Sequence, residues 1–170
     1  MGATSLTHAT AIPSVTDIDG VVLTPLRIIP SPKGDVLHGI KSQDPGFFGF
    51  GEAYFSTVMS DVVKGWKRHK RMILNLVVPA GEISFSLLDR RASVPGLMRT
   101  VTLGRNNYCR LTIPPNIWVS FVGRSSGLNL LLNVANLTHD PEEAENVEPG
   151  ALGLPPADEC FPFIKQATKN

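Results

Sequence analysis

The sequence predicts an all-β protein, a sandwich or a barrel, built from many short strands. Its 170 residues include 15 glycines and 14 prolines, a high share for a helical bundle because both residue types interrupt helices. Short apolar runs alternate with turn-forming clusters, and hardly any run repeats with the helical period. Within residues 82–89, Ile83, Phe85 and Leu87 alternate with polar side chains, which is the pattern of a strand that buries one face.

Nine runs are expected to form the strands. In chain order they cover residues 21–29, 47–56, 62–69, 72–78, 82–89, 99–103, 108–113, 118–122 and 128–135. The first is aliphatic and ends at a Pro-Ser-Pro turn, the second is aromatic and alternates in part, and the last is the strongest late apolar run. Clusters of Gly, Pro, Asn and Asp separate the runs and favour turns. Residues 36–40 are expected to be weakly structured.

The two ends of the chain differ from its centre. Residues 1–16 mix Thr, Ser, His and Ala and are expected to form a loose N-terminal arm. Residues 139–145 predict a turn with an acidic, helical start, because Asp140 precedes Pro141 and two glutamates and can cap them. Residues 150–170 form a Pro/Gly-rich tail. The length favours one domain over residues 1–170, with a short helical segment near the C-terminus.

Composition excludes several classes of protein. Sixteen Lys and Arg against 15 Asp and Glu give a net charge of +1, so neither a basic nucleic-acid coat nor an acidic tail is present. Cys109 and Cys160 are too few for a disulfide framework, and no C-x-x-C zinc motif occurs. No signal-peptide pattern and no run of 18 apolar residues is found. We expect a cytoplasmic protein without membrane or nucleic-acid partners.

The densest cluster of charged residues is the run Lys64-Gly65-Trp66-Lys67-Arg68-His69-Lys70-Arg71. A solvated charged face is the plainest interpretation, since charge runs are usually surface. A nucleic-acid patch is a weaker interpretation, because nothing else in the sequence supports it and the aromatic residues are not interleaved with the cations as platforms for base stacking. The third interpretation is a site for an anionic ligand, and it depends on how the side chains alternate.

On a strand, alternation would place Lys67, His69 and Arg71 on one face and Trp66, Arg68 and Lys70 on the other. Cations that flank a histidine disfavour the imidazolium form. A neutral imidazole beside cations suits a general base whose neighbours bind phosphate or stabilise an enolate. The alternation therefore adds a specific chemistry to the third interpretation.

Several motifs resemble the cupin-fold dTDP-4-dehydrorhamnose 3,5-epimerases. In order they are Phe47-Phe48, Ser56, Val63-Lys64-Gly65, Gly81-Glu82-Ile83, Asp89-Arg90, Ile113-Pro114-Pro115 and Asp140-Pro141-Glu142. A more specific match is to a divergent branch of sugar-nucleotide epimerases, through Tyr54-Phe55-Ser56, Val63 to His69 and Asn75-Leu76-Val77-Val78-Pro79. The resemblance covers roughly residues 20–148.

The resemblance implies a cupin-type double-stranded β-helix, a jelly-roll barrel, that forms a homodimer. It also implies cofactor-free epimerisation, at C3, C5 or both, of a nucleotide-linked 4-keto-6-deoxy sugar, most simply a dTDP sugar. A proton next to the ketone is removed and returned on the opposite face. A sugar-nucleotide 3,4-ketoisomerase and a non-catalytic cupin that binds sugar nucleotides stay open as alternatives. The nucleotide, the sugar and the inverted carbon are not fixed by the sequence.

The expected site residues follow from the resemblance together with strand alternation. They are His69 as the base, Lys67 as the enolate-stabilising cation, and Tyr54, which lies within the matched motif, as a proton donor or sugar contact. The expected substrate-binding residues are Lys64, Arg71, Ser56, Asn75, Trp118 and Asn133. Asn133 falls where the family has its general-acid tyrosine, and an amide cannot deliver a proton at neutral pH.

Two further positions depart from the family pattern. Pro45 stands where the family has a nucleotide-binding arginine, and Lys67 where it has its base. The histidine comes two residues later, at His69, with the same strand parity. No metal is expected, because a metal cupin needs a His-x-His pair and a later histidine. The first motif offers only His69, and residues 118–132 contain no histidine.

Overall fold

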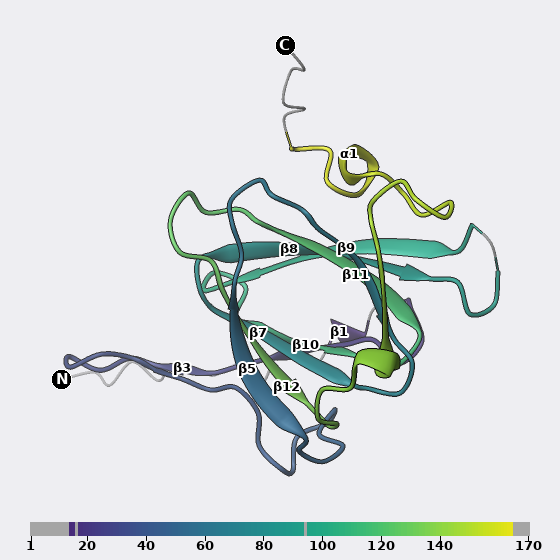
Figure 1. Ribbon diagram of the computed structural model, residues 1–170. Helices are drawn as coiled ribbons and strands as arrows, with labels where there is room; N and C mark the ends of the chain where they lie inside the picture. Colours follow the sequence, from purple (N-terminus) through teal and green to yellow (C-terminus); the bar gives the residue numbers. More distant parts are fainter. Residues whose placement is uncertain (1–13, 16, 94, 165–170) are drawn as a thin grey trace.

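Two antiparallel sheets face each other and form a barrel, seen as an upper and a lower layer in a computed structural model of the chain (Figure 1). The structure describes residues 14–15, 17–93 and 95–164. From one edge to the other, the six-stranded first sheet contains β1 (Ser14–Val15), β2 (Val22–Pro25), β10 (Cys109–Ile113), β7 (Leu74–Ala80), β12 (Leu130–Ala135) and β5 (Glu52–Thr57). The five-stranded second sheet contains β13 (Ala144–Val147), β6 (Lys64–His69), β11 (Ile117–Gly123), β8 (Glu82–Asp89) and β9 (Leu97–Gly104).

The chain crosses between the sheets at almost every connection from β5 onward. β5, β7, β10 and β12 belong to the first sheet, and β6, β8, β11 and β13 to the second. This alternation of antiparallel strands between two layers is the jelly-roll arrangement. The all-β jelly-roll prediction is therefore confirmed. Among the described residues, no helix has both the length and the hydropathy that crossing a membrane requires.

The main core lies between the sheets and follows the alternation seen in the sequence. Ile83, Phe85 and Leu87 of β8 are fully buried there. Ser84 and Ser86, on the opposite face of β8, are buried as well. They bond to the hydroxyls of Thr102 and Thr100, and Ser86 also bonds to the carbonyl of Cys160. Since these serines are buried, another part of the chain must cover the outer face of the second sheet.

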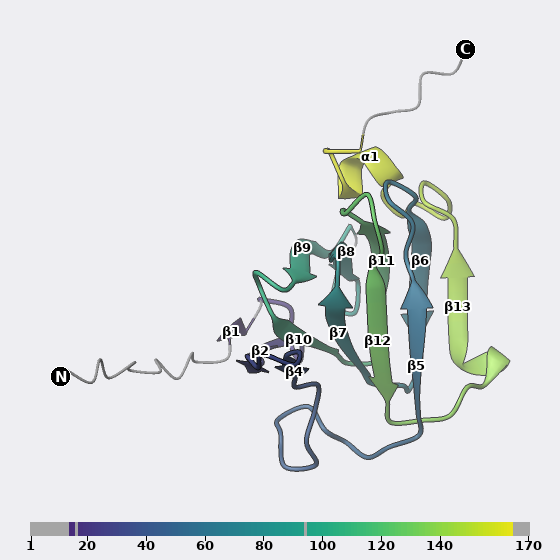
Figure 2. The same ribbon diagram turned by 90° about the vertical axis from the view of Figure 1, so that its left-hand side faces the viewer.

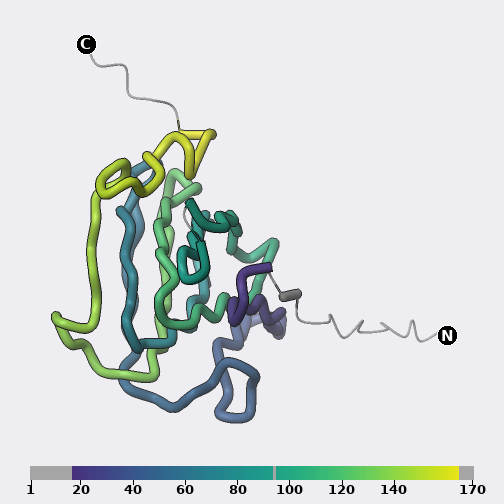
Figure 3. The backbone as a smooth tube through the Cα atoms, turned by 90° about the vertical axis from the view of Figure 1, so that its right-hand side faces the viewer, coloured from purple at the N-terminus to yellow at the C-terminus, as the bar shows by residue number. Residues whose placement is uncertain are grey.

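The C-terminal segment provides this cover. It includes α1 (Ala157–Cys160) and lies against the outer side of the second sheet (Figures 1 and 2). In Figure 3 the late, yellow part of the tube runs along one side of the barrel and then over its top. A second apolar cluster forms here, in which Leu154 and Phe161 pack with Trp66 and Trp118. The Pro/Gly-rich tail is thus partly structural.

Phe161→Ala tests this cover, because Phe161 is fully buried. We expect the free energy of unfolding in urea to fall by about 3–5 kcal/mol, the usual cost of truncating a buried phenylalanine. Leu152→Ala is the matched control in the same segment, since Leu152 is 81% exposed, and should change stability by less than about 0.5 kcal/mol. Equal, small effects of both variants would show that the segment does not pack on the sheet.

Several predicted boundaries are wrong for local reasons. The run 21–29 is not one strand: β2 ends at Pro25, and the chain then leaves the barrel in a hairpin of β3 (Ile28–Ile29) and β4 (Val36–Leu37), which projects sideways in Figure 1. The run 47–56 becomes extended only at Glu52, because Gly46 and Gly49 have positive φ angles of 88° and 101°.

The C-terminal turn is confirmed and leads into a strand that was not predicted. Pro141–Glu143 form a single 3₁₀ turn, η1, and the Asp140 side chain accepts a hydrogen bond from the amide of Glu142 at 3.0 Å. β13 follows directly and pairs with β6. The expected loose arm lies largely outside the described residues; Ser14–Val15 pair with β2.

Candidate active site

A cavity of about 340 Å³ lies between the sheets. It is on the side of the barrel where β5 is the edge strand of the first sheet and β13 is the edge strand of the second. Its polar lining comes from β5, β6, β12 and β13, and its apolar lining from β7, β11 and β12. Six of the predicted site residues line it: Tyr54, Ser56, Lys64, Lys67, His69 and Asn133. The remaining polar side chain is Asn146, which the sequence did not indicate.

β6 positions the basic residues by alternation. Lys67 and His69 line the cavity, whereas Trp66 lies in the second apolar cluster on the other face. Arg68 also faces outward, where it pairs with Glu145 at 2.8 Å and lies 4.9 Å from the ring centroid of Trp118. From Gly65 to His69 the period of two therefore separates a cavity face from a packed outer face. Lys64 also lines the cavity although it has the parity of Trp66, and the pairing of β6 with β11 shifts register between Lys64 and Lys67.

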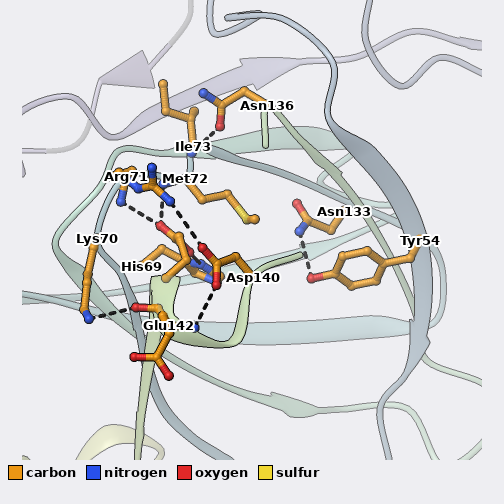
Figure 4. A network of polar contacts seen from close by, with 11 residues as sticks. Tyr54, His69, Lys70, Arg71, Met72, Ile73, Asn133, Asn136, Asp140 and Glu142 are labelled. Atoms are coloured by element: carbon orange, nitrogen blue, oxygen red, sulfur yellow. Dashed lines mark hydrogen bonds and ion pairs between the residues drawn. The ribbon is translucent and has the colours of Figure 1, made fainter. Parts of the chain in front are cut away.

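His69 is held by a buried carboxylate. Its Nδ1 lies 2.5 Å from Glu143 Oε2, and the two residues are 8% and 2% exposed. The other oxygen of Glu143 accepts hydrogen bonds from the main-chain amides of Arg71 at 2.6 Å and Met72 at 2.7 Å. Figure 4 shows this network beside the turn at Asp140. Because both carboxylate oxygens are engaged, the imidazole has one fixed orientation.

The protonation states follow from burial and these contacts. Burial lowers the pKa of His69 and outweighs the opposing effect of Glu143, with small further lowering by Lys67 and His139. Burial alone would raise the pKa of Glu143, but hydrogen bonds from the Arg71 amide, His69 and the Met72 amide hold it below its ordinary value. His69 is thus neutral beside an ionised Glu143. Nδ1 carries the proton that Glu143 accepts, and Nε2 keeps a lone pair.

The cavity is electropositive. Lys64 and Lys67 line it, and no acidic residue is among its described lining residues. The Lys64 ammonium donates to the carbonyl of Thr57 at 3.2 Å and lies 5.8 Å from the ring centroid of Phe121. For Lys67 no ion pair is found within the described part of the chain. Two cations without a carboxylate in the lining suit an anionic ligand.

Tyr54 approaches from the opposite sheet. It pairs in register with Asn133 across β5 and β12, and the Asn133 amide donates to the Tyr54 hydroxyl at 3.0 Å. Figure 4 shows the phenol and the His69 ring on facing sides of the same space. Tyr54 is 40% exposed, so its ring lies toward the mouth of the cavity.

Three predicted substrate-binding residues lie outside the cavity lining. β6 ends at His69, so alternation does not reach Arg71, whose exposed guanidinium lies 3.4 Å from Asp140. Asn75 is on the far face of β7, where it donates to the carbonyl of Gly46 and accepts from Thr112. Trp118 is on the outer face of β11, in the second apolar cluster. The candidate site therefore does not include these three residues.

Glu143 is the residue of the candidate site that the sequence did not reveal. The capped turn at Asp140 was recognisable, but nothing local shows that one of its glutamates meets a histidine 74 positions earlier. Among the described residues, no group of three or more His, Cys, Asp or Glu side chains is placed to hold a metal ion.

Comparison with known proteins gives solved structures only; no protein-family model and no curated protein matches the chain. A dTDP-sugar isomerase from Desulfovibrio desulfuricans G20 is 39% identical, with a TM-score of 0.76 over 81% of this chain and 89% of that one. QdtA, a sugar 3,4-ketoisomerase from Thermoanaerobacterium thermosaccharolyticum solved with TDP, is 21% identical, with a TM-score of 0.63 over 75% and 88%.

NovW, a 4-keto-6-deoxy sugar epimerase from Streptomyces spheroides, is 17% identical, with a TM-score of 0.72 over 84% of this chain and 76% of that one. NovW and QdtA share the fold with this chain. The Desulfovibrio protein is similar enough in sequence, over most of both chains, to show the family. The resemblance drawn from the motifs is therefore confirmed, and the chain belongs to the cupin family of dTDP-sugar isomerases and 3,5-epimerase-like enzymes.

Proposed function

We propose that this protein epimerises a dTDP-linked 4-keto-6-deoxy sugar by removing and returning a proton next to the ketone. The observation that carries the proposal is His69, which lines a cavity that also holds two lysines and is bound at Nδ1 by the buried Glu143 carboxylate behind it. A neutral histidine held at Nδ1 has its Nε2 available as a base. The family supports the substrate class, since the 39% identical relative is a dTDP-sugar isomerase.

Each step is assigned to a residue of the cavity. His69 Nε2 takes the proton from the carbon beside the ketone, and the electrons of that C–H bond move to give an enolate with its charge on the ketone oxygen. Lys67 stabilises this oxygen electrostatically. Tyr54 then delivers its hydroxyl proton to the same carbon from the facing side, which inverts the centre. The imidazolium loses its proton to solvent and the phenolate regains one, so the enzyme returns to its starting state.

Binding of the nucleotide part is assigned to the remaining polar groups. Lys64 lies among the lining residues and would pair with the diphosphate, as a point charge rather than a bidentate fork. Ser56, on the same face of β5 as Tyr54, and Asn133 are near enough to the cavity to meet sugar hydroxyls. The leucines of β7 and β12 line the apolar part and would contact the deoxy methyl group.

The test is incubation with dTDP-4-keto-6-deoxyglucose in D₂O, followed by proton NMR of the sugar. We expect loss of the C3 or C5 proton signal together with signals of the inverted sugar. A carbonyl that moves from C4 to C3 would establish the 3,4-ketoisomerase alternative, which the name of the 39% identical relative also permits. Nucleotide-sugar binding without any exchange would contradict catalysis and leave a binding cupin.

We further propose that the protein is a homodimer that pairs through the β5 edge. β5 has a neighbour on one side only, and unpaired edges favour association. Phe50, Phe55 and Met59, in and beside this strand, are each more than 60% exposed. Light scattering after size-exclusion chromatography should give twice the monomer mass, and Phe55→Glu should give the monomer. A cytoplasmic location stays a prediction.

A further inference from the structure

Asn133 occupies an unusual position in the cavity. It is 2% exposed, yet its side-chain oxygen has no hydrogen-bond partner among the described residues. Its amide nitrogen donates to the Tyr54 hydroxyl. Buried polar atoms are normally satisfied, and one that is not costs stability. An aliphatic side chain of similar size would avoid this cost, so the fold does not explain the asparagine.

The contact has a directional consequence for Tyr54. When an amide N–H donates to the phenol oxygen, the phenol proton must point away from that nitrogen. Register pairing of β5 and β12 fixes both backbones, and both side chains line the cavity. The Tyr54 hydroxyl faces the space that it shares with His69 (Figure 4), and this space is one direction left open to the phenol proton.

We propose that Asn133 is a positioning residue that holds the Tyr54 hydroxyl in the geometry for proton delivery; this inference rests on the proposed function. At the position where the resemblance expects a tyrosine, this chain has an amide, and the tyrosine stands opposite it on the neighbouring strand. The acid is thus supplied by β5 and oriented by β12. A proton donor acts well only when its geometry is fixed before the reaction.

Removal of the proton by His69 and its return by Tyr54 are separate steps that can be measured separately. When His69 has formed the enolate and Tyr54 is misplaced, the imidazolium can return a solvent-exchanged proton to the face from which it came. Substrate then acquires deuterium without becoming product. The ratio of deuterium exchange into recovered substrate to product formation therefore measures how well Tyr54 delivers its proton.

The decisive variant is Asn133→Leu, measured by the same NMR experiment in D₂O. Tyr54→Phe should raise the exchange-to-product ratio about 100-fold, since a positioned acid contributes roughly 10²- to 10⁴-fold. Asn133→Leu should raise it about tenfold, as loss of orientation alone is a smaller effect than loss of the group. The variant that carries both substitutions should match Tyr54→Phe, because Asn133 acts through Tyr54.

Asn106→Leu is the control for the same chemical change, since Asn106 is exposed in the turn between β9 and β10 and is not among the residues that line the cavity. Its exchange-to-product ratio should equal that of the unmodified protein. Thermal unfolding of Asn133→Leu should be unchanged or shifted upward, because the unsatisfied carbonyl is removed.

Three results would overturn the inference. An unaltered ratio in Asn133→Leu would show that the amide does not position Tyr54. A parallel loss of exchange and product together with a lower unfolding temperature would show a structural role instead. If the unmodified protein shows no exchange at all, the proposed function fails and the inference fails with it. The first two results are distinguishable from this one, because in both of them the unmodified protein does exchange the proton.

Discussion

His69→Asn is expected to lower kcat by about 10³-fold, the scale on which a positioned general base contributes. Nucleotide-sugar binding should persist, because the diphosphate is assigned to Lys64. The imidazole is neutral, so its replacement by an amide leaves the charge of the cavity unchanged. Asparagine is close in size and can still donate to the oxygen of Glu143 that lies against His69 Nδ1. Steady-state kinetics and calorimetric titration with the substrate measure the two effects separately.

His38→Asn provides the control for this substitution. His38 lies outside the active-site cavity, and the hydrogen bond that Tyr108 donates to it goes to the main-chain carbonyl, which the substitution keeps. Its kcat and affinity should match the unmodified protein. Retention of full turnover by His69→Asn would assign proton removal to another group of the cavity, and Lys67 would be the next residue to replace.

Glu143→Gln is expected to lower kcat by about two orders of magnitude or more, because a histidine that loses its carboxylate partner also loses its tautomer and orientation. A carboxylate offers two acceptor oxygens, whereas an amide offers one. The glutamine oxygen could satisfy either His69 or the amides of Arg71 and Met72, which Glu143 serves together. The free energy of unfolding should fall by about 1–3 kcal/mol, the cost of leaving buried donors unpaired.

The pH profile of kcat/KM gives this variant a second signature. A base must be neutral to act, so activity is lost as the pH falls through the pKa of His69. Burial places this pKa below its ordinary value, and Glu143 partly opposes the shift. Removing the carboxylate charge removes the opposing effect, so the pKa of His69 falls further. The acid limb of the profile should therefore move to lower pH.

Glu142→Gln is the matched control for both measurements. Glu142 is exposed, and its recorded contacts run through its main chain, to Lys70 and Asp140. Stability, kcat and the acid limb should all stay unchanged. An acid limb that moves upward in Glu143→Gln would contradict the assignment of a neutral His69 beside an ionised Glu143.

Local patterns in the sequence were enough to predict the architecture. Alternation in residues 82–89 gave β8 with its bounds unchanged, and turn-forming residues separated most of the other strands. Alternation also placed Lys67 and His69 on one face of β6, because the side-chain period of a strand is a property of its own backbone. The motifs around these residues carried enough information to identify the family.

Which face of each strand meets the cavity depends on packing between distant parts of the chain. Period-two alternation shows which residues share a face, but in β7 and β11 both faces are buried, so polarity could not distinguish inside from outside. The sequence therefore predicts Asn75 and Trp118 as substrate-binding residues, whereas both side chains lie on the outer faces of their strands, covered by other parts of the chain. The loop at Gly46 and the C-terminal segment cover these faces, and no local pattern reveals such cover.

Contacts between distant segments were likewise invisible in the sequence. Glu143 meets His69 only because β13 pairs with β6 and carries the preceding turn to the end of that strand. Tyr54 faces Asn133 only because β5 and β12 pair in one register among several that their sequences allow. Local sequence was sufficient for most of the strands, for the family and for the cavity face of β6 at Lys67 and His69. Strand pairing across the barrel, which depends on packing of the whole chain, decided the partners of the base and of the acid.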